Sequence, residues 1–228
     1  MYKNNVEIVV ARYNEDLYWL NEYPFNQFEY IVYNKGDNEN FHKTNVKEIV
    51  ELPNIGRCDH TYLYHIIKNY DNLSNVVVFF PGSLVENKKD KAIKILNCII
   101  NSKFQKAFFL GSYYQSIKNA FGDFTLNEWK ASYIQNFSKN NESKLQICKI
   151  RPYYNWYSYF FGNARAHWCS MWGIFSIDKK DIIQHPITRY QHLIQTVNNH
   201  SNPEAGHYIE RSWGAIFYPL IYTIKMNY

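Results

Sequence analysis

The sequence has few cysteines and none of the short motifs that mark the common enzyme classes. Its four cysteines form no Cys-x-x-Cys pair, so we expect reduced thiols and a cytoplasmic location. The dinucleotide-binding motif (Gly-x-Gly-x-x-Gly) and the phosphate-loop motif (Gly-x-x-x-x-Gly-Lys-Ser/Thr) are both absent. So are the zinc-protease motif (His-Glu-x-x-His) and the serine-hydrolase motif (Gly-x-Ser-x-Gly). The sequence therefore argues against these four functions.

Two further absences concern partners. No apolar run approaches the roughly 20 residues that a membrane-spanning helix needs, so we predict no membrane span. The sequence has no block of lysine and arginine of the kind that binds nucleic acids. Segment 88–94 carries charges of both signs, which is typical of a solvated helix face. The formal net charge is only +5, which could steer an anionic substrate such as a nucleotide sugar.

What the sequence has in excess is aromatic residues, at 18% of the chain. The bias of an AT-rich genome explains much of the total, because Asn, Lys and Ile are abundant too. The densest cluster is YYNWYSYFFGN at 153–163, followed closely by His167, Trp168 and Trp172. Aromatic rings offer flat apolar faces to sugars, so we interpret this cluster, read as a loop, as a wall for a sugar acceptor. Core packing is the alternative.

Apolar runs and helical patterns alternate in the first half. Nearly unbroken apolar runs predict buried strands at 6–11, 28–33 and 76–80, and amphipathic patterns predict helices at 61–70 and 88–100. Strands of this kind, separated by helices, indicate an α/β fold with a mostly parallel central sheet flanked by helices.

The second half is less regular. We expect strands at 145–150 and 167–177, a short helix capped by Asp178, and helices at 187–198 and 204–217. No repeat or long linker divides the chain. Residues 1–228 are therefore expected to form one domain.

Polar residues follow each of the three predicted strands in the first half. In open α/β sheets the ligand lies beyond the carboxyl ends of the strands. We therefore expect these residues to bind the ligand, with a plain strand-to-helix turn capped by Asn14 as the alternative for the first group. The residues are Arg12, Tyr13 and Asn14, then Asn34 and Lys35, then Gly82 and Ser83.

Segment 54–61, which comes just before the helix predicted at 61–70, offers a second anion site. Backbone N–H groups of a first helical turn can face an anion, and Arg57 could grip a diphosphate with two hydrogen bonds. A capping role for Asp59 is the alternative.

The segment EAGHYIERSWGAIF at 204–217 carries the candidate catalytic residue. On a helix, Glu210 and Trp213 share one face, and a carboxylate partly removed from water beside a ring suits a general base. A Glu210–arginine ion pair that fixes the helix is the alternative.

These pieces, in this order, resemble a known family. VVARYNEDLYWL, YNKG, the NIGRCDHTYLYHIIKNYDNL stretch, the VVFF strand and the GIFSIDKKDI…ERSWGAIF ending are similar to fungal, bacterial and giant-virus proteins mostly labelled as of unknown function. The chlorovirus relative of that family is a GT-A-type glycosyltransferase domain, a rhamnosyltransferase acting on viral glycans. The resemblance spans about residues 6–218.

The resemblance implies a GT-A-like fold and transfer of a sugar from a UDP- or GDP-sugar donor to a glycan acceptor, in the host cytoplasm if the protein is viral. Arg12, Tyr13, Asn14 and Arg57 would then face the donor, with Glu210 as the base. The donor half would cover about residues 1–110, and the acceptor and catalytic half about 111–228. On this interpretation His167, Trp168, Trp172 and Trp213 would contact the acceptor.

Two departures from the family pattern bear on the site. Cys58 stands where members carry a glutamate after the Gly-Arg pair, with Asp59 next along. No Asp-x-Asp follows the third strand, where GT-A enzymes hold Mn²⁺ or Mg²⁺. Metal-independent transfer is therefore an alternative to a metal held by His207 or Asp59.

The sequence thus favours an inverting glycosyltransferase with Glu210 as general base. A non-catalytic carbohydrate- or nucleotide-binding module is the alternative. A single-stranded RNA binder would also use aromatic residues, but the basic residues are sparse and interspersed, so we predict no nucleic-acid partner.

Overall fold

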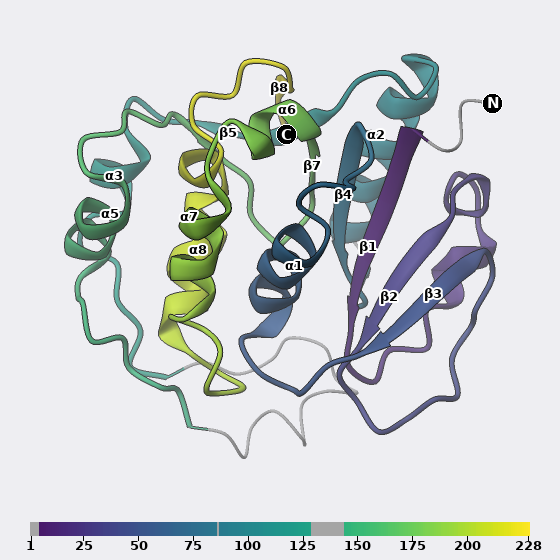
Figure 1. Cartoon of the computed structure of the whole chain (residues 1–228), viewed down its shortest axis with the longest axis horizontal. Helices are drawn as coiled ribbons and strands as arrows, with labels where there is room; N and C mark the ends of the chain where they lie inside the picture. The colour runs from purple at the N-terminus through teal and green to yellow at the C-terminus, as the bar shows by residue number, and fades with distance from the viewer. Residues whose placement is uncertain (1–4, 86, 129–143) are drawn as a thin grey trace.

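The computed structural model describes residues 5–85, 87–128 and 144–228. Its centre is a five-stranded sheet in the order β3-β2-β1-β4-β7 (Figure 1). The first four strands are parallel, and β7 runs antiparallel beside β4. Their bounds are β1 Val6–Arg12, β2 Tyr30–Asn34, β3 Val46–Glu51, β4 Val76–Pro81 and β7 Phe175–Asp178. The predicted α/β class with a mostly parallel central sheet flanked by helices is confirmed.

A smaller sheet has the order β6-β5-β8. It contains β5 Phe108–Tyr113, β6 Trp168–Cys169 and β8 Ile224–Asn227. β5 pairs antiparallel with β6 and parallel with β8.

Helices cover both faces of the central sheet. Along β1, Val9 faces a core formed with α1, α5, α7 and α8, whereas Ile8 and Val10 face a second core formed with α2 and two short 3₁₀ helices. In Figure 1, α1, α7 and α8 stand beside one another on the near side, and α2 lies behind β4. The helix bounds are α1 Arg57–Lys68, α2 Asn87–Asn101, α3 Ile117–Ala120, α5 Tyr153–Phe161, α6 Lys179–Ile183, α7 Ile187–Ile194, α8 Glu204–Ile216, η2 Tyr18–Asn21 and η3 Phe25–Gln27.

The structure corrects several predicted elements. The cluster at 153–163 forms the helix α5 and no loop: Trp156 and Tyr157 are buried, while Tyr159 faces solvent. Segment 145–150 is not a strand and makes only an isolated bridge between Gln146 and Pro203. The run at 167–177 is two short strands in different sheets, because a turn after Cys169 separates β6 from β7.

The predicted capping of the short helix α6 by Asp178 is confirmed. The Asp178 carboxylate accepts a hydrogen bond from the Lys180 backbone at 2.9 Å. No helix in the described residues is both long enough and apolar enough to span a membrane.

Candidate functional site

The carboxyl ends of the parallel strands form one edge of the sheet. The chain runs from β1 outward through β2 to β3, then crosses back to place β4 on the other side of β1. The crevice at such a reversal of strand order is where open α/β sheets bind ligands. The segments that leave β1 and β4 therefore flank the expected binding crevice.

Arg12 ends β1 and is fully buried. Its Nε donates to the carbonyl of Glu15 at 2.7 Å, and its Nη1 donates to the Asn34 side chain and to the Asn38 carbonyl. The guanidinium also lies 4.0 Å from the centre of the Phe41 ring. Arg12 thus joins the loops that follow β1 and β2. Its side chain is hydrogen-bonded to those loops and is not exposed to a nucleotide-sugar donor.

Tyr13 and Asn14 follow β1, Ser83 follows β4, and all three are partly exposed. Between them lies the buried carboxylate of Glu15, whose Oε2 accepts a hydrogen bond from the Tyr13 backbone at 2.7 Å. A Cβ on Gly82 would lie 2.8 Å from the same oxygen, so any larger residue there would displace the Glu15 carboxylate. Glu15 is a residue to which the sequence analysis gave no role.

Lys35 follows β2 and is buried beneath the start of α1. Its Nζ donates to the carbonyls of Ile55, at 2.6 Å, and of Arg57. Burial lowers the pKa of Lys35 to about 7, because desolvation disfavours the charged form. Lys35 therefore fixes the helix start beside the crevice.

Arg57 is the first residue of α1 and meets the loop before α8. Its Nη2 donates to the Asn202 side chain at 2.8 Å, and its Nε does so at 3.2 Å. Burial lowers the pKa of Arg57 to about 10, against the opposing effects of Cys58 and Asp59. The guanidinium stays cationic at neutral pH at the amino end of a helix, where the helix dipole also favours an anion.

Asp59 lies in the first turn of α1 and is almost fully buried. Its Oδ1 accepts a hydrogen bond from the indole Nε1 of Trp213 at 3.1 Å, and the Cys58 Sγ lies 3.8 Å from its Oδ2. Burial, followed by the nearby charge of Glu210, raises the pKa of Asp59 to about 8. Asp59 and Glu210 are therefore neighbouring carboxyl groups on two different helices.

Glu210 lies on α8 with its side chain about 20% exposed. Its Oε1 accepts a hydrogen bond from the Trp172 backbone at 2.8 Å, and its Oε2 lies 3.8 Å from the Arg211 Nη1. Arg211 is the partner foreseen in the ion-pair alternative, but at 3.8 Å the contact is loose. One carboxylate oxygen is held in place while the group still reaches solvent, as a general base must.

Lys91, on α2, is a site residue that the sequence analysis missed. It is buried, and its Nζ donates to the Ser170 hydroxyl at 2.8 Å and to the Met171 carbonyl at 2.9 Å. Burial lowers the pKa of Lys91 to about 7, with Cys169 and Glu210 opposing. The signal was available, because Lys91 shares the buried face of its helix with Ile95.

The four aromatic residues predicted to contact an acceptor lie in different settings. Trp172 is 36% exposed beside Glu210, whereas Trp213 is fully buried, which does not fit stacking on a sugar. The His167 ring stacks on Tyr113 with centroids 5.5 Å apart, and its Nδ1 lies 2.9 Å from the Gln115 carbonyl.

Trp168 approaches the site through its backbone. A Cβ on Gly214 would lie 2.0 Å from the Trp168 carbonyl oxygen, so β6 packs directly on α8 one turn beyond Glu210. The Trp168 ring lies edge-on to Tyr113, at 5.7 Å. Trp168 and His167 therefore border the site, and Trp172 lies within it.

The described residues offer no group of three or more His, Cys, Asp or Glu side chains that could hold a metal ion. His207 is buried on α8, and burial together with Arg57 and Arg211 lowers its pKa to about 3. The positive charges of Arg57 and Arg211 would likewise repel a metal cation at His207. The surroundings of Asp59 and His207 thus fit a divalent metal poorly.

The structure therefore brings Arg57, Asp59, His207 and Glu210 together at the carboxyl edge of the sheet. No curated protein matches the sequence. The family model described as "Protein of unknown function (DUF3431)" matches residues 8–223, so the chain belongs to this family.

Proposed function

We propose that the protein is an inverting glycosyltransferase that moves a sugar from a nucleoside-diphosphate donor to a hydroxyl of a glycan acceptor. One observation carries the proposal. The carboxylate of Glu210 is fixed and partly exposed, and its charge acts on the cationic guanidinium of Arg57 at the start of α1, near the reversal of strand order. The parallel strands also suit the GT-A-like fold that the resemblance implies.

In this mechanism Glu210 removes the proton from the acceptor hydroxyl. The resulting oxygen attacks the anomeric carbon as the bond from that carbon to the diphosphate oxygen breaks, and the bonding electrons leave with the diphosphate. Arg57 and the N–H groups of the first turn of α1 stabilise the growing negative charge. Positioning and charge stabilisation therefore supply most of the catalysis.

The donor would lie along the crevice, against Tyr13, Asn14 and Ser83. Arg12 and Lys35 would support it indirectly, because they hold the loops after β1 and β2 and the start of α1. A Mn²⁺ or Mg²⁺ ion would need ligands beyond Asp59 and His207. The proposed mechanism therefore uses no metal ion.

A donor screen tests the proposal. The protein is incubated with UDP- and GDP-sugars, with and without Mn²⁺, and thermal stabilisation and release of nucleoside diphosphate are measured. We expect one nucleotide class to raise the melting temperature and its sugar conjugate to be slowly hydrolysed. Neither stabilisation nor hydrolysis by any donor would contradict the proposal.

The second candidate is a non-catalytic carbohydrate- or nucleotide-binding module. It is favoured by the burial of Arg12 and Lys35, because their hydrogen bonds to the carbonyls of the neighbouring loops leave these two cations inaccessible to a departing diphosphate. In the same screen this module would be stabilised by a nucleotide or a free glycan without any turnover.

A further inference from the structure

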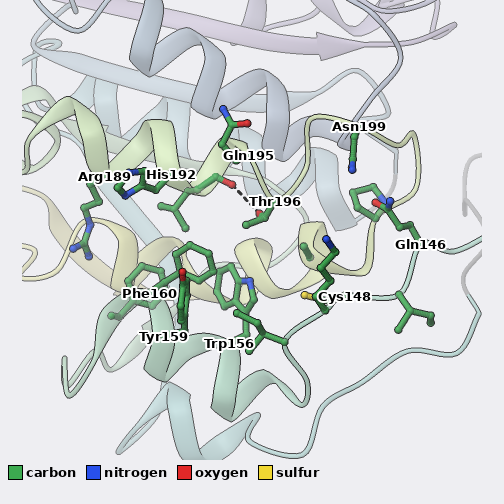
Figure 2. A pocket seen from close by; sticks show the side chains of 17 residues that line it. Gln146, Cys148, Trp156, Tyr159, Phe160, Arg189, His192, Gln195, Thr196 and Asn199 are labelled. Carbon is green, nitrogen blue, oxygen red and sulfur yellow. Dashed lines mark hydrogen bonds between the residues drawn. The ribbon is translucent and has the colours of Figure 1, made fainter.

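A pocket of about 640 Å³ lies between α5 and α7 (Figure 2). Ala205 of α8 lines this α5–α7 pocket. Glu210 follows five residues later, about 140° around the helix. The lining includes Trp156, Tyr159, Phe160 and Phe161, which belong to the aromatic cluster interpreted from the sequence as a wall for a sugar acceptor. The reactive edge consists of Arg57, Asp59, His207 and Glu210, and none of these four residues lines the pocket. The pocket is therefore separate from the reactive edge.

The lining combines aromatic rings with polar groups. Figure 2 shows Trp156, Tyr159 and Phe160 of α5 on one side of the pocket. His192 of α7 and Thr196 of the turn after α7 face them. Aromatic side chains present flat apolar faces to the C–H groups of a sugar ring, and hydroxyl, amide and imidazole groups bind its hydroxyls.

The charged residues of the lining also suit a saccharide. No Asp or Glu of the described residues lines the pocket. Arg189 is already engaged, since its Nε and Nη2 donate to the carbonyls of Ile216 and Ala215 and its guanidinium lies 5.2 Å from the Phe161 ring. Lys149 is a second cation in the lining and is exposed, so an uncharged or acidic saccharide fits this lining better than a cationic ligand.

One polar group at the pocket is left without a partner. The Trp156 Nε1 is buried, and no atom of the described residues accepts its hydrogen bond. An unpaired buried N–H costs about 1–3 kcal/mol. A ligand oxygen that accepted this hydrogen bond would remove the cost.

The wall of the pocket is preformed. The Cys148 backbone donates to the Glu204 Oε2 at 2.8 Å, and the Gln146 backbone donates to the Asn202 carbonyl at 2.9 Å. These bonds fix the segment that closes one side of the pocket, and preformed pockets of this size are typical ligand sites.

We infer that the α5–α7 pocket is a saccharide-binding site distinct from the reactive edge. The pocket chemistry alone carries this inference, so it does not depend on the transfer reaction. If the protein is a glycosyltransferase, the site would hold a glycan chain away from the point of transfer.

Isothermal titration of the full chain tests the inference with three probes: maltohexaose, chitohexaose and tetragalacturonate. Tyr159 is 72% exposed, so Tyr159→Ala should fold normally, which its melting temperature checks. Tyr23→Ala removes an aromatic ring of similar exposure, 65%, outside the pocket lining and is the matched control.

We expect at least one probe to bind, and Tyr159→Ala to weaken it about tenfold, the scale of losing one ring contact. Tyr23→Ala and Glu210→Gln should bind as the unaltered protein does. The inference is overturned if no probe binds, or if binding survives Tyr159→Ala. It is also overturned if Glu210→Gln abolishes binding, because the saccharide would then lie at the reactive edge.

Discussion

The indole of Trp213 donates a hydrogen bond to the carboxyl group of Asp59 at 3.1 Å, joining α8 to the first turn of α1. Both side chains are buried. The bond holds Asp59 where the negative charge of Glu210 contributes to raising its pKa. Residues 154 positions apart in the chain thus define one site.

Trp213→Phe keeps most of the ring and removes the donor to Asp59. We expect the free energy of unfolding to fall by about 1–3 kcal/mol, the cost of leaving a buried acceptor unpaired. Urea unfolding measures this change. Trp172→Phe is the control, because that ring is partly exposed, and it should shift the unfolding free energy much less. Equal effects of the two variants would contradict the importance of the Trp213–Asp59 bond.

The pKa of Asp59 predicts a pH dependence of stability. Burial raises that pKa from 3.8 to about 8, so between these values the folded protein holds a proton that the unfolded chain has released. This group therefore lowers stability as pH rises from about 4 to 8.

Asp59→Asn removes that proton exchange. The unfolding free energy of the variant minus that of the unaltered protein should become more positive from about pH 5 to pH 8, by at most about 1.4 kcal/mol per pH unit. Urea unfolding at several pH values across this range measures it. A difference that stays constant with pH would contradict the raised pKa of Asp59.

The hydrogen bonds of Glu204 at the start of α8 predict that replacing this residue lowers the stability of the protein strongly. Its fully buried carboxylate accepts hydrogen bonds from the backbones of Leu126 and Cys148, at 2.9 and 2.8 Å, from the Tyr208 hydroxyl at 2.8 Å, and pairs with Arg151 at 3.1 Å. Glu204→Gln should cost about 3 kcal/mol of unfolding free energy, since it breaks a buried pair.

Glu22→Gln is the matched control for Glu204→Gln. It removes one partner of a surface ion pair with Lys89, in which the Glu22 side chain is 38% exposed. Pairs of this kind contribute about 1 kcal/mol or less. A loss from Glu204→Gln as small as the loss from Glu22→Gln would contradict the account of this buried network.

Arg57→Lys tests the donor site. Lysine keeps the positive charge but loses the planar fork that can hold two oxygens at once. We expect kcat and kcat/KM for the donor to fall about tenfold, because Arg57 stabilises the negative charge that grows on the diphosphate in the transition state. Arg165→Lys, at an exposed position, should leave kcat and kcat/KM unchanged. An unaltered kcat/KM for the donor in Arg57→Lys would remove Arg57 from the donor site.

The parallel sheet could be predicted from the sequence because each strand buried on both faces is a nearly unbroken apolar run. The edge strand β3 escaped prediction because only Val46 and Val50 of its six residues are even partly buried. The helix α5 was mistaken for a loop, since its polar residues interrupt the aromatic pattern that its buried face requires.

The candidate site was predictable only in part. The position of Glu210 and Trp213 on one helix could be predicted from local periodicity, but α1 begins at Arg57 and not at Thr61 as predicted. The burial of Arg12 and Trp213 depends on contacts with loops and helices far away in the chain, which no local pattern reveals. The part played by Lys91 likewise depends on the distant turn at Ser170.

The most direct test of the account is turnover in Glu210→Gln with the donor and acceptor identified by screening. If Glu210 is the general base, kcat falls about a hundredfold or more, while donor binding and the melting temperature stay unchanged. Glu48→Gln, at an exposed position on β3, serves as the control and keeps full turnover. Undiminished turnover in Glu210→Gln would contradict the central claim that this carboxylate activates the acceptor.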